Sequence, residues 1–100
     1  MTANYVQATV DALTRRVGKP DGSDSDLMRL YALLVHTTGT ATSLKDVHDA
    51  WALWRTHTKP EHADLVEFEQ LPAEVQDYDR PYRDAIRELA ALRTNGGEQP

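Results

Sequence analysis

The stretch SDSDLMRLYALLVHTTG, residues 23–39, decides the fold because it has the pattern of an amphipathic helix with a wide apolar face. Its apolar positions are Leu27, Met28, Leu30, Tyr31, Leu34 and Val35. Four of them follow helical spacing, while Met28 and Val35 widen the face enough to predict contact with more than one neighbour. Ser23 or Ser25 is the expected N-cap, and Gly39 ends the helix. We therefore expect this segment to be the central helix.

A second amphipathic helix is predicted upstream. Its apolar stripe consists of Val6, Val10, Leu13 and Val17. Arg15 and Arg16 face away from that stripe. Gly18 can cap the helix in the left-handed conformation, and Pro20 prevents its continuation. Residues 19–24 are then a linker to the central helix.

A third helix is predicted downstream of a hydroxyl-rich loop. Ser43 is its expected N-cap, and Asp46 stands three residues later, as in a capping box. Apolar positions then recur at Val47, Ala50, Trp51 and Trp54. The pattern fades between residues 56 and 60, which predicts a helix of about four turns.

The last third of the chain predicts an extended segment followed by two helices. Leu65, Val66 and Phe68 alternate over too short a span for a helix. Residues 72–78 form a short helix or a single turn. Asp79 is the expected cap of the final helix, which ends near Arg93 and whose apolar stripe is Tyr82, Ala85, Ile86, Leu89 and Leu92. Residues 95–100 should be disordered because they have nothing to bury.

These elements together predict a mainly all-α fold: a small orthogonal bundle of four helices with one short extended segment. Residues 1–94 would form a single helical domain, followed by the 95–100 tail. One hundred residues suit one domain with one core, and leave little chain to enclose a deep site.

Charge and composition exclude several classes of function. Eleven Lys and Arg against 16 Asp and Glu give a net charge of -5, which disfavours nucleic acid as a partner. Cysteine is absent, so disulfides, thiolate nucleophiles and Cys-based zinc sites are excluded. No apolar run reaches the about 20 residues that span a bilayer, and the N-terminal residues lack signal-peptide features. We expect a cytoplasmic protein without a membrane contact.

Catalytic and metal signals are absent as well. The four histidines, His36, His48, His57 and His62, are never three or four residues apart, so none share a helix face as paired ligands. The sequence contains no glycine-rich phosphate loop and no serine nucleophile elbow. We predict a protein that is not an enzyme and uses no metal or other cofactor.

Aromatic residues are the better candidates for recognition. His48 and Trp51 share a helix face, so they either hold a ligand between imidazole and indole, or Trp51 is core and His48 ties down the segment around residues 65–71. If Trp54 is the exposed indole, it becomes a partner-binding hot spot that Tyr78 and Tyr82 extend.

Three arginines recur along the final helix. Arg80, Arg83 and Arg87 could together grip a phosphate or carboxylate. The alternative is neutralisation within the helix, since Asp79 and Arg83 have the four-residue spacing of a favourable ion pair.

Residues 45–90 also resemble the ryanodine-receptor repeat domain. The resemblance rests on the His-Asp-Ala-Trp of residues 48–51, on the LVEFEQLP of residues 65–72, and on His62, Asp79 and Tyr82. The family's aromatic and glycine-rich loop is reduced here to residues 56–63. The resemblance implies binding of a nucleotide-derived ligand, with His48, Trp51, His62 and Arg80 as the contacting residues. A wider likeness to short proteins of actinobacterial phages implies an accessory phage protein.

Two functional hypotheses follow. The first is a non-catalytic interaction protein that binds a protein partner, such as a host protein, through Trp54, Tyr78 and Tyr82. The second is a module that binds a nucleotide-type ligand. Helix one is peripheral in the sequence and could pack across a two-fold axis, so pairing of two copies is a third possibility.

Overall fold

Residues 4–18 and 25–93 are described by the computed structural model, and every regular element within them is helical. The α-helices are α1 (Tyr5–Val17), α2 (Ser25–His36), α3 (Leu44–Thr58), α4 (Ala73–Gln76) and α5 (Arg80–Leu92). Three short 3-10 turns connect them: η2 (Gly39–Ala41), η3 (Phe68–Gln70) and η4 (Asp77–Asp79). The predicted small all-α bundle is confirmed.

Local capping signals set both ends of α1 and the start of α3. Gly18 takes the left-handed φ of 74° at the end of α1, as predicted. At the start of α3 the Asp46 backbone N–H donates to Ser43 Oγ at 3.0 Å. The Ser43 N–H donates back to the Asp46 carboxylate at 2.9 Å, so the predicted capping box is complete. These bonds satisfy helix donors that would otherwise lack a partner.

Helix α2 is the central helix, as the width of its apolar face predicts. It packs against α1, α3 and α5. Its residues Leu27, Met28, Tyr31 and Ala32 are at most 1% exposed. The buried cluster consists of Val10, Leu13, Leu27, Met28, Tyr31, Ala32, Val35, Val47, Trp54, Ala85, Ile86 and Ala90. The four long helices therefore share one core.

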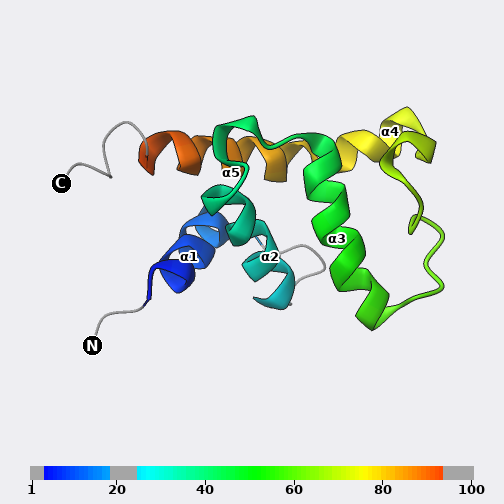
Figure 1. The fold of residues 1–100 in the computed structure, drawn as a ribbon, viewed down its shortest axis with the longest axis horizontal. Coiled ribbons are helices and arrows are strands. Elements are labelled where there is room, and N and C mark those ends of the chain that lie inside the picture. Colours follow the sequence, from blue (N-terminus) through cyan, green and yellow to red (C-terminus); the bar gives the residue numbers. More distant parts are fainter. Residues whose placement is uncertain (1–3, 19–24, 94–100) are drawn as a thin grey trace.

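Helix α5 runs along one side of the molecule and crosses α3 near its N-terminal end (Figure 1). Two side-chain contacts hold it there. Arg87 Nε donates to the Thr42 carbonyl at 2.6 Å, in the turn before α3. Arg16 of α1 pairs with Glu88 at 2.7 Å. Both α1 and the η2 turn are thus tied to α5.

The predicted extended segment is only partly correct. Residues 59–72 form the long connection on the far side of α3 (Figure 1), but no strand forms within the described residues. Phe68 begins the η3 turn, where the Gln70 N–H donates to Glu67 O and the Leu71 N–H to Phe68 O. The backbone satisfies its polar groups locally because no other strand is available to pair with it.

Several predictions fall outside the described residues. These are the 19–24 linker, the Ser23 alternative for the N-cap of α2, and the 95–100 tail. Within the described ranges, no helix combines the length and hydropathy required of a membrane-crossing segment.

Candidate functional site

A cleft forms where α3 faces the start of α5 and the 59–79 connection. We call it the aromatic cleft. Its lining residues are Tyr31, His48, Trp51, Arg55, His62, Asp64, Leu71, Val75, Tyr78, Asp79 and Tyr82. Its volume is about 310 Å³. It collects aromatic rings and titratable side chains from segments far apart in the sequence.

His48 and Trp51 form one wall of the cleft. They lie one turn apart on α3, and their rings stack with centroids 5.6 Å apart and planes inclined by 27°. His48 is 3% exposed, and its Nε2 lies 2.7 Å from the Val66 carbonyl. A carbonyl only accepts, so His48 Nε2 is the donor. This bond supports the alternative in which His48 ties down the 65–71 segment.

His62 brings a second imidazole to the same wall. Its ring meets the Trp51 indole edge to face, with centroids 5.2 Å apart and an interplanar angle of 85°. The Asp64 backbone N–H donates to His62 Nδ1 at 3.0 Å. Nδ1 must therefore be unprotonated, which leaves the proton of the neutral ring on Nε2. His62 can thus offer a donor to a ligand.

Arg55 stands one turn after Trp51 on α3. Its guanidinium carbon lies 4.4 Å from the centroid of the Trp54 ring and 5.8 Å from that of Trp51. Both distances are within cation–π range. The Arg55 charge is therefore engaged with two indoles rather than projecting freely into the cleft.

Three tyrosines line the cleft at different depths. Tyr31 is 1% exposed, and its ring lies 5.3 Å from that of the half-buried Tyr82. Tyr78 is 69% exposed. Tyr31 and Tyr82 therefore belong to the floor, and Tyr78 to the rim.

Asp79 differs from its predicted role. It immediately precedes α5, but its side chain makes no capping hydrogen bond. The carboxyl group instead lines the aromatic cleft. Burial raises the pKa of Asp79 to about 6, and the nearby His48 acts in the opposite direction. A half-buried carboxyl group in a cleft with a perturbed pKa is a typical feature of functional sites.

The three arginines of α5 do not form an anion site. Arg80 pairs with Asp77 at 2.6 Å, and Arg83 pairs with Asp84 at 2.7 Å rather than with Asp79. Arg87 binds the Thr42 carbonyl. Arg80 is not among the residues lining the aromatic cleft. Of the four predicted ligand contacts, the structure thus brings together His48, Trp51 and His62, but not Arg80.

Trp54 is not the exposed indole. It is 7% exposed and belongs to the core, whereas Trp51 is only half-buried. Tyr78 and Tyr82 lie at the aromatic cleft, but Trp54 lines a separate pocket of about 340 Å³ with Leu30, Leu53 and His57. The three predicted partner-binding residues therefore do not share one surface, because Trp54 faces α2 instead.

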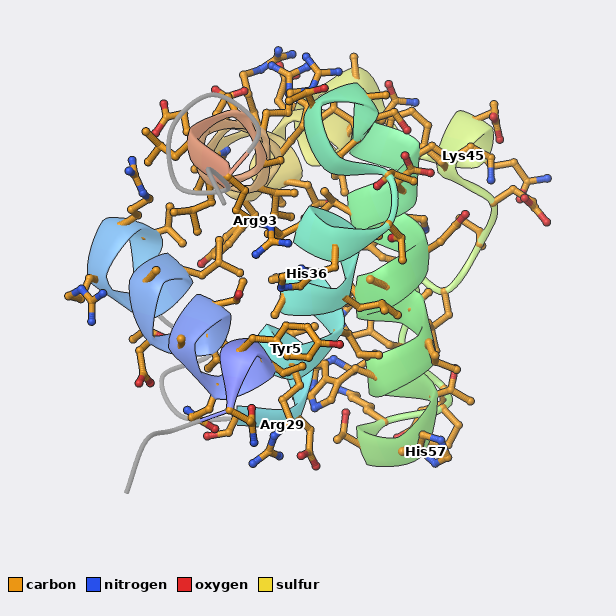
Figure 2. All side chains as sticks on the ribbon, turned by 60° about the vertical axis from the view of Figure 1, so that its left-hand side comes forward. Tyr5, Arg29, His36, Lys45, His57 and Arg93 are labelled. Atoms are coloured by element: carbon orange, nitrogen blue, oxygen red, sulfur yellow. The ribbon has the colours of Figure 1, made fainter. Side chains whose placement is uncertain are left out.

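A larger groove of about 540 Å³ lies between α1 and α5. Figure 2 shows Tyr5, His36 and Arg93 directed into the space between α1, α2 and α5. Tyr5 meets His36 edge to face at 5.0 Å, and Thr9 Oγ lies 2.9 Å from His36 Nε2. The groove is lined mainly by apolar side chains and carries no carboxyl group. It lacks the concentration of titratable groups found in the aromatic cleft.

Sequence reasoning missed Arg55, Asp64 and Asp79 as cleft residues. The four-residue spacing of Trp51 and Arg55 places both on one helix face, and could have identified Arg55. Asp64 and Asp79 have no such signal, since the folding of the 59–79 connection brings them to α3. Within residues 4–18 and 25–93, no three His, Asp or Glu side chains are placed to hold a metal ion.

Comparison with known proteins identifies one family. A family described as a domain of unknown function (DUF7701) matches residues 4–91, which is nearly all of the described chain. No curated protein matches the sequence, and no solved structure matches it either. Because the match covers α1, α2, α3, nearly all of α5 and the aromatic cleft, the chain belongs to the DUF7701 family.

Proposed function

We propose that this protein is a non-catalytic module that binds a small planar ligand, such as the base of a nucleotide-derived molecule, in the aromatic cleft. One observation carries the proposal: Trp51, Tyr78 and Tyr82 line a common cleft with two imidazoles and a half-buried carboxyl group. Ligand sites typically combine apolar and aromatic walls with a few convergent polar groups. The resemblance of residues 45–90 to the ryanodine-receptor repeat supports the same ligand class.

Binding without catalysis is favoured by how the imidazoles are used. His48 Nε2 donates a hydrogen bond to the Val66 carbonyl, and His62 Nδ1 accepts one from the Asp64 backbone N–H. Each ring uses one nitrogen to hold the 62–66 backbone in place, which is a structural use of histidine.

A ligand screen tests the proposal. Free bases, nucleosides, nucleotides and cyclic nucleotides are added to the whole protein, and the unfolding midpoint is followed by differential scanning fluorimetry. A ligand at one hundred times its dissociation constant stabilises the fold by about 2.7 kcal/mol, so binding raises the midpoint measurably. No shift with any compound would refute the proposal.

Two matched tyrosine variants locate the site. Tyr78 at the cleft rim is 69% exposed, and Tyr5 at the α1–α5 groove is 67% exposed. We expect Tyr78→Ala to weaken binding of any hit by about tenfold, since base–aromatic stacking is worth roughly 1–3 kcal/mol. Tyr5→Ala should leave binding unchanged. The opposite result would place the ligand in the α1–α5 groove.

A protein partner is the second candidate function. The exposure of Tyr78 favours it, because exposed tyrosine is a common anchor at interfaces. Under this second hypothesis a cytoplasmic host protein would contact the rim of the aromatic cleft, in line with the resemblance to short proteins of actinobacterial phages. We expect Tyr78→Ala to lose partners that the native protein and Tyr5→Ala both capture. Capture of the same partners by all three proteins would argue against this surface.

A further inference from the structure

Resting on the proposed ligand-binding function, we infer that the aromatic cleft selects a ring carrying a cationic or N–H-rich edge, such as an amidinium, and rejects a phosphate group. The edge would face Asp79, and the ring would lie among Trp51, Tyr78 and Tyr82.

The charges lining the cleft favour a cation. Its carboxyl groups are Asp64 and Asp79, and its guanidinium is Arg55. Arg55 already lies over the Trp51 and Trp54 rings. A phosphate in the cleft would therefore meet two carboxylates with one partly engaged cation to oppose them, which is unfavourable in a partly desolvated site.

The arginines of α5, which could have bound a phosphate, contact other groups outside the cleft. Arg80 and Arg83 pair with Asp77 and Asp84, and Arg87 binds the Thr42 carbonyl. None of the three lines the cleft. Moving one of them into the cleft would break an existing ion pair or hydrogen bond.

The aromatic lining also suits a cation. A cation near the face of an indole or phenol ring is attracted by the ring quadrupole, and desolvation strengthens this attraction. Trp51 already shows this preference, since its ring attracts the Arg55 guanidinium. Tyr31, Tyr78 and Tyr82 line the same cleft as Asp79.

Size limits the ligand to a single ring system. The cleft volume of about 310 Å³ lies at the lower end of the range of about 300–1,000 Å³ that is typical of ligand pockets. A planar amidinium matches a carboxylate with two parallel N–H donors, the geometry that makes guanidinium–carboxylate pairs strong. Asp79 can accept both, because its oxygens are not used to cap α5.

Benzamidine and benzamide test the inference. They share ring and shape, but benzamidine is cationic and benzamide is neutral. Binding of each to the whole protein is measured at pH 8 by NMR titration, with inorganic phosphate as a third probe. We expect benzamidine to bind at least tenfold more tightly than benzamide, with shifts at Trp51 and Tyr82, and phosphate to give none.

Asp79→Asn is the decisive variant, and Asp77→Asn is its control because Asp77 pairs with Arg80 outside the cleft. The preference for benzamidine should disappear in Asp79→Asn and persist in Asp77→Asn. Equal binding of both probes, phosphate binding, or a preference unaffected by Asp79→Asn overturns the inference. If benzamidine fails while the nucleoside screen yields a neutral ligand at Trp51, the charge assignment is wrong and the proposed function survives. If no compound binds, both are wrong.

Discussion

At the scale of single residues, Asp79 connects the cleft to stability. Its pKa is raised from 3.8 to about 6 by burial, so the folded protein holds this proton more tightly than the unfolded chain does. The free energy of unfolding should therefore fall as pH rises from about 4 to about 6, and stay lower above that range. A half-buried carboxylate at neutral pH is a cost to the fold that a ligand cation could relieve.

Asp79→Asn should accordingly stabilise the protein at neutral pH. Raising the pKa of Asp79 from 3.8 to about 6 corresponds to roughly 3 kcal/mol, which solvent screening of a half-buried group reduces to about 1 kcal/mol. We expect that gain at pH 8, and little difference between the variant and the native protein at pH 4. Urea unfolding at both pH values measures it. A variant that is less stable at pH 8 would show that the Asp79 charge is compensated in the fold.

The role of His48 was predictable only as one of two alternatives. Its bond to the Val66 carbonyl, 18 residues away in the sequence, supports the one in which it ties down the 65–71 segment. The role of Asp79 was not predictable, because an Asp before a proline-containing helix start is a typical cap in sequence. Only the fold shows that this carboxyl group lines the cleft beside His48 rather than bonding to the α5 backbone.

At the scale of elements, α3 should depend on its capping box. Ser43→Ala removes the bond to the Asp46 N–H, and should lower the free energy of unfolding by about 1 kcal/mol. Ser43→Asp keeps an acceptor at that position and should cost much less. Chemical denaturation of both variants measures the difference. Equal losses in the two variants would show that the hydroxyl bond is not what stabilises this end of α3.

The stability of residues 59–71, the first part of the 59–79 connection, should depend on His48. His48→Ala leaves the Val66 carbonyl without its donor and removes a buried ring, so we expect a loss of about 2–4 kcal/mol. His57→Ala, on the exposed C-terminal turn of the same helix, is the control and should cost little.

Hydrogen exchange locates the effect. In His48→Ala, amides of residues 62–71 should exchange faster than those of α1, because the connection opens before the core does. Uniform acceleration over the whole protein would mean that His48 stabilises the core and not the connection in particular.

Some element boundaries were predictable from local signals, although Gly39 does not end α2, which already ends at His36. Gly18, Ser43 and Asp46 act within a few residues, and the structure places the helix ends where they predict. The 65–68 segment carries no such signal. Its alternating apolar residues resemble a strand, but a strand needs a partner, and the described chain supplies only helices. Phe68 enters a 3-10 turn as a result.

At the scale of the whole molecule, the core and the aromatic cleft occupy separate regions. The core is built around α2, and Trp54 is its largest contribution from α3. Trp51, one turn earlier, packs against this core but also lines the aromatic cleft. The sequence gives no basis for deciding which indole is buried, because three residues of separation place both near the same stripe. The position of α2 decides which indole is buried, because α2 covers Trp54, whereas Trp51 lies beside the 59–79 connection.

This division predicts different consequences for the two tryptophans. Trp54→Ala should lower the free energy of unfolding by about 3–5 kcal/mol, a large part of the 5–15 kcal/mol typical of a domain. Trp51→Ala should cost roughly 1–2 kcal/mol, since its ring is half-buried, while abolishing binding of any ligand found in the screen. Trp54→Phe keeps the core filled and should bind that ligand like the native protein. Denaturation curves and ligand titrations of the three variants measure both properties, and a Trp51→Ala protein that still binds would show that the aromatic cleft is not the site.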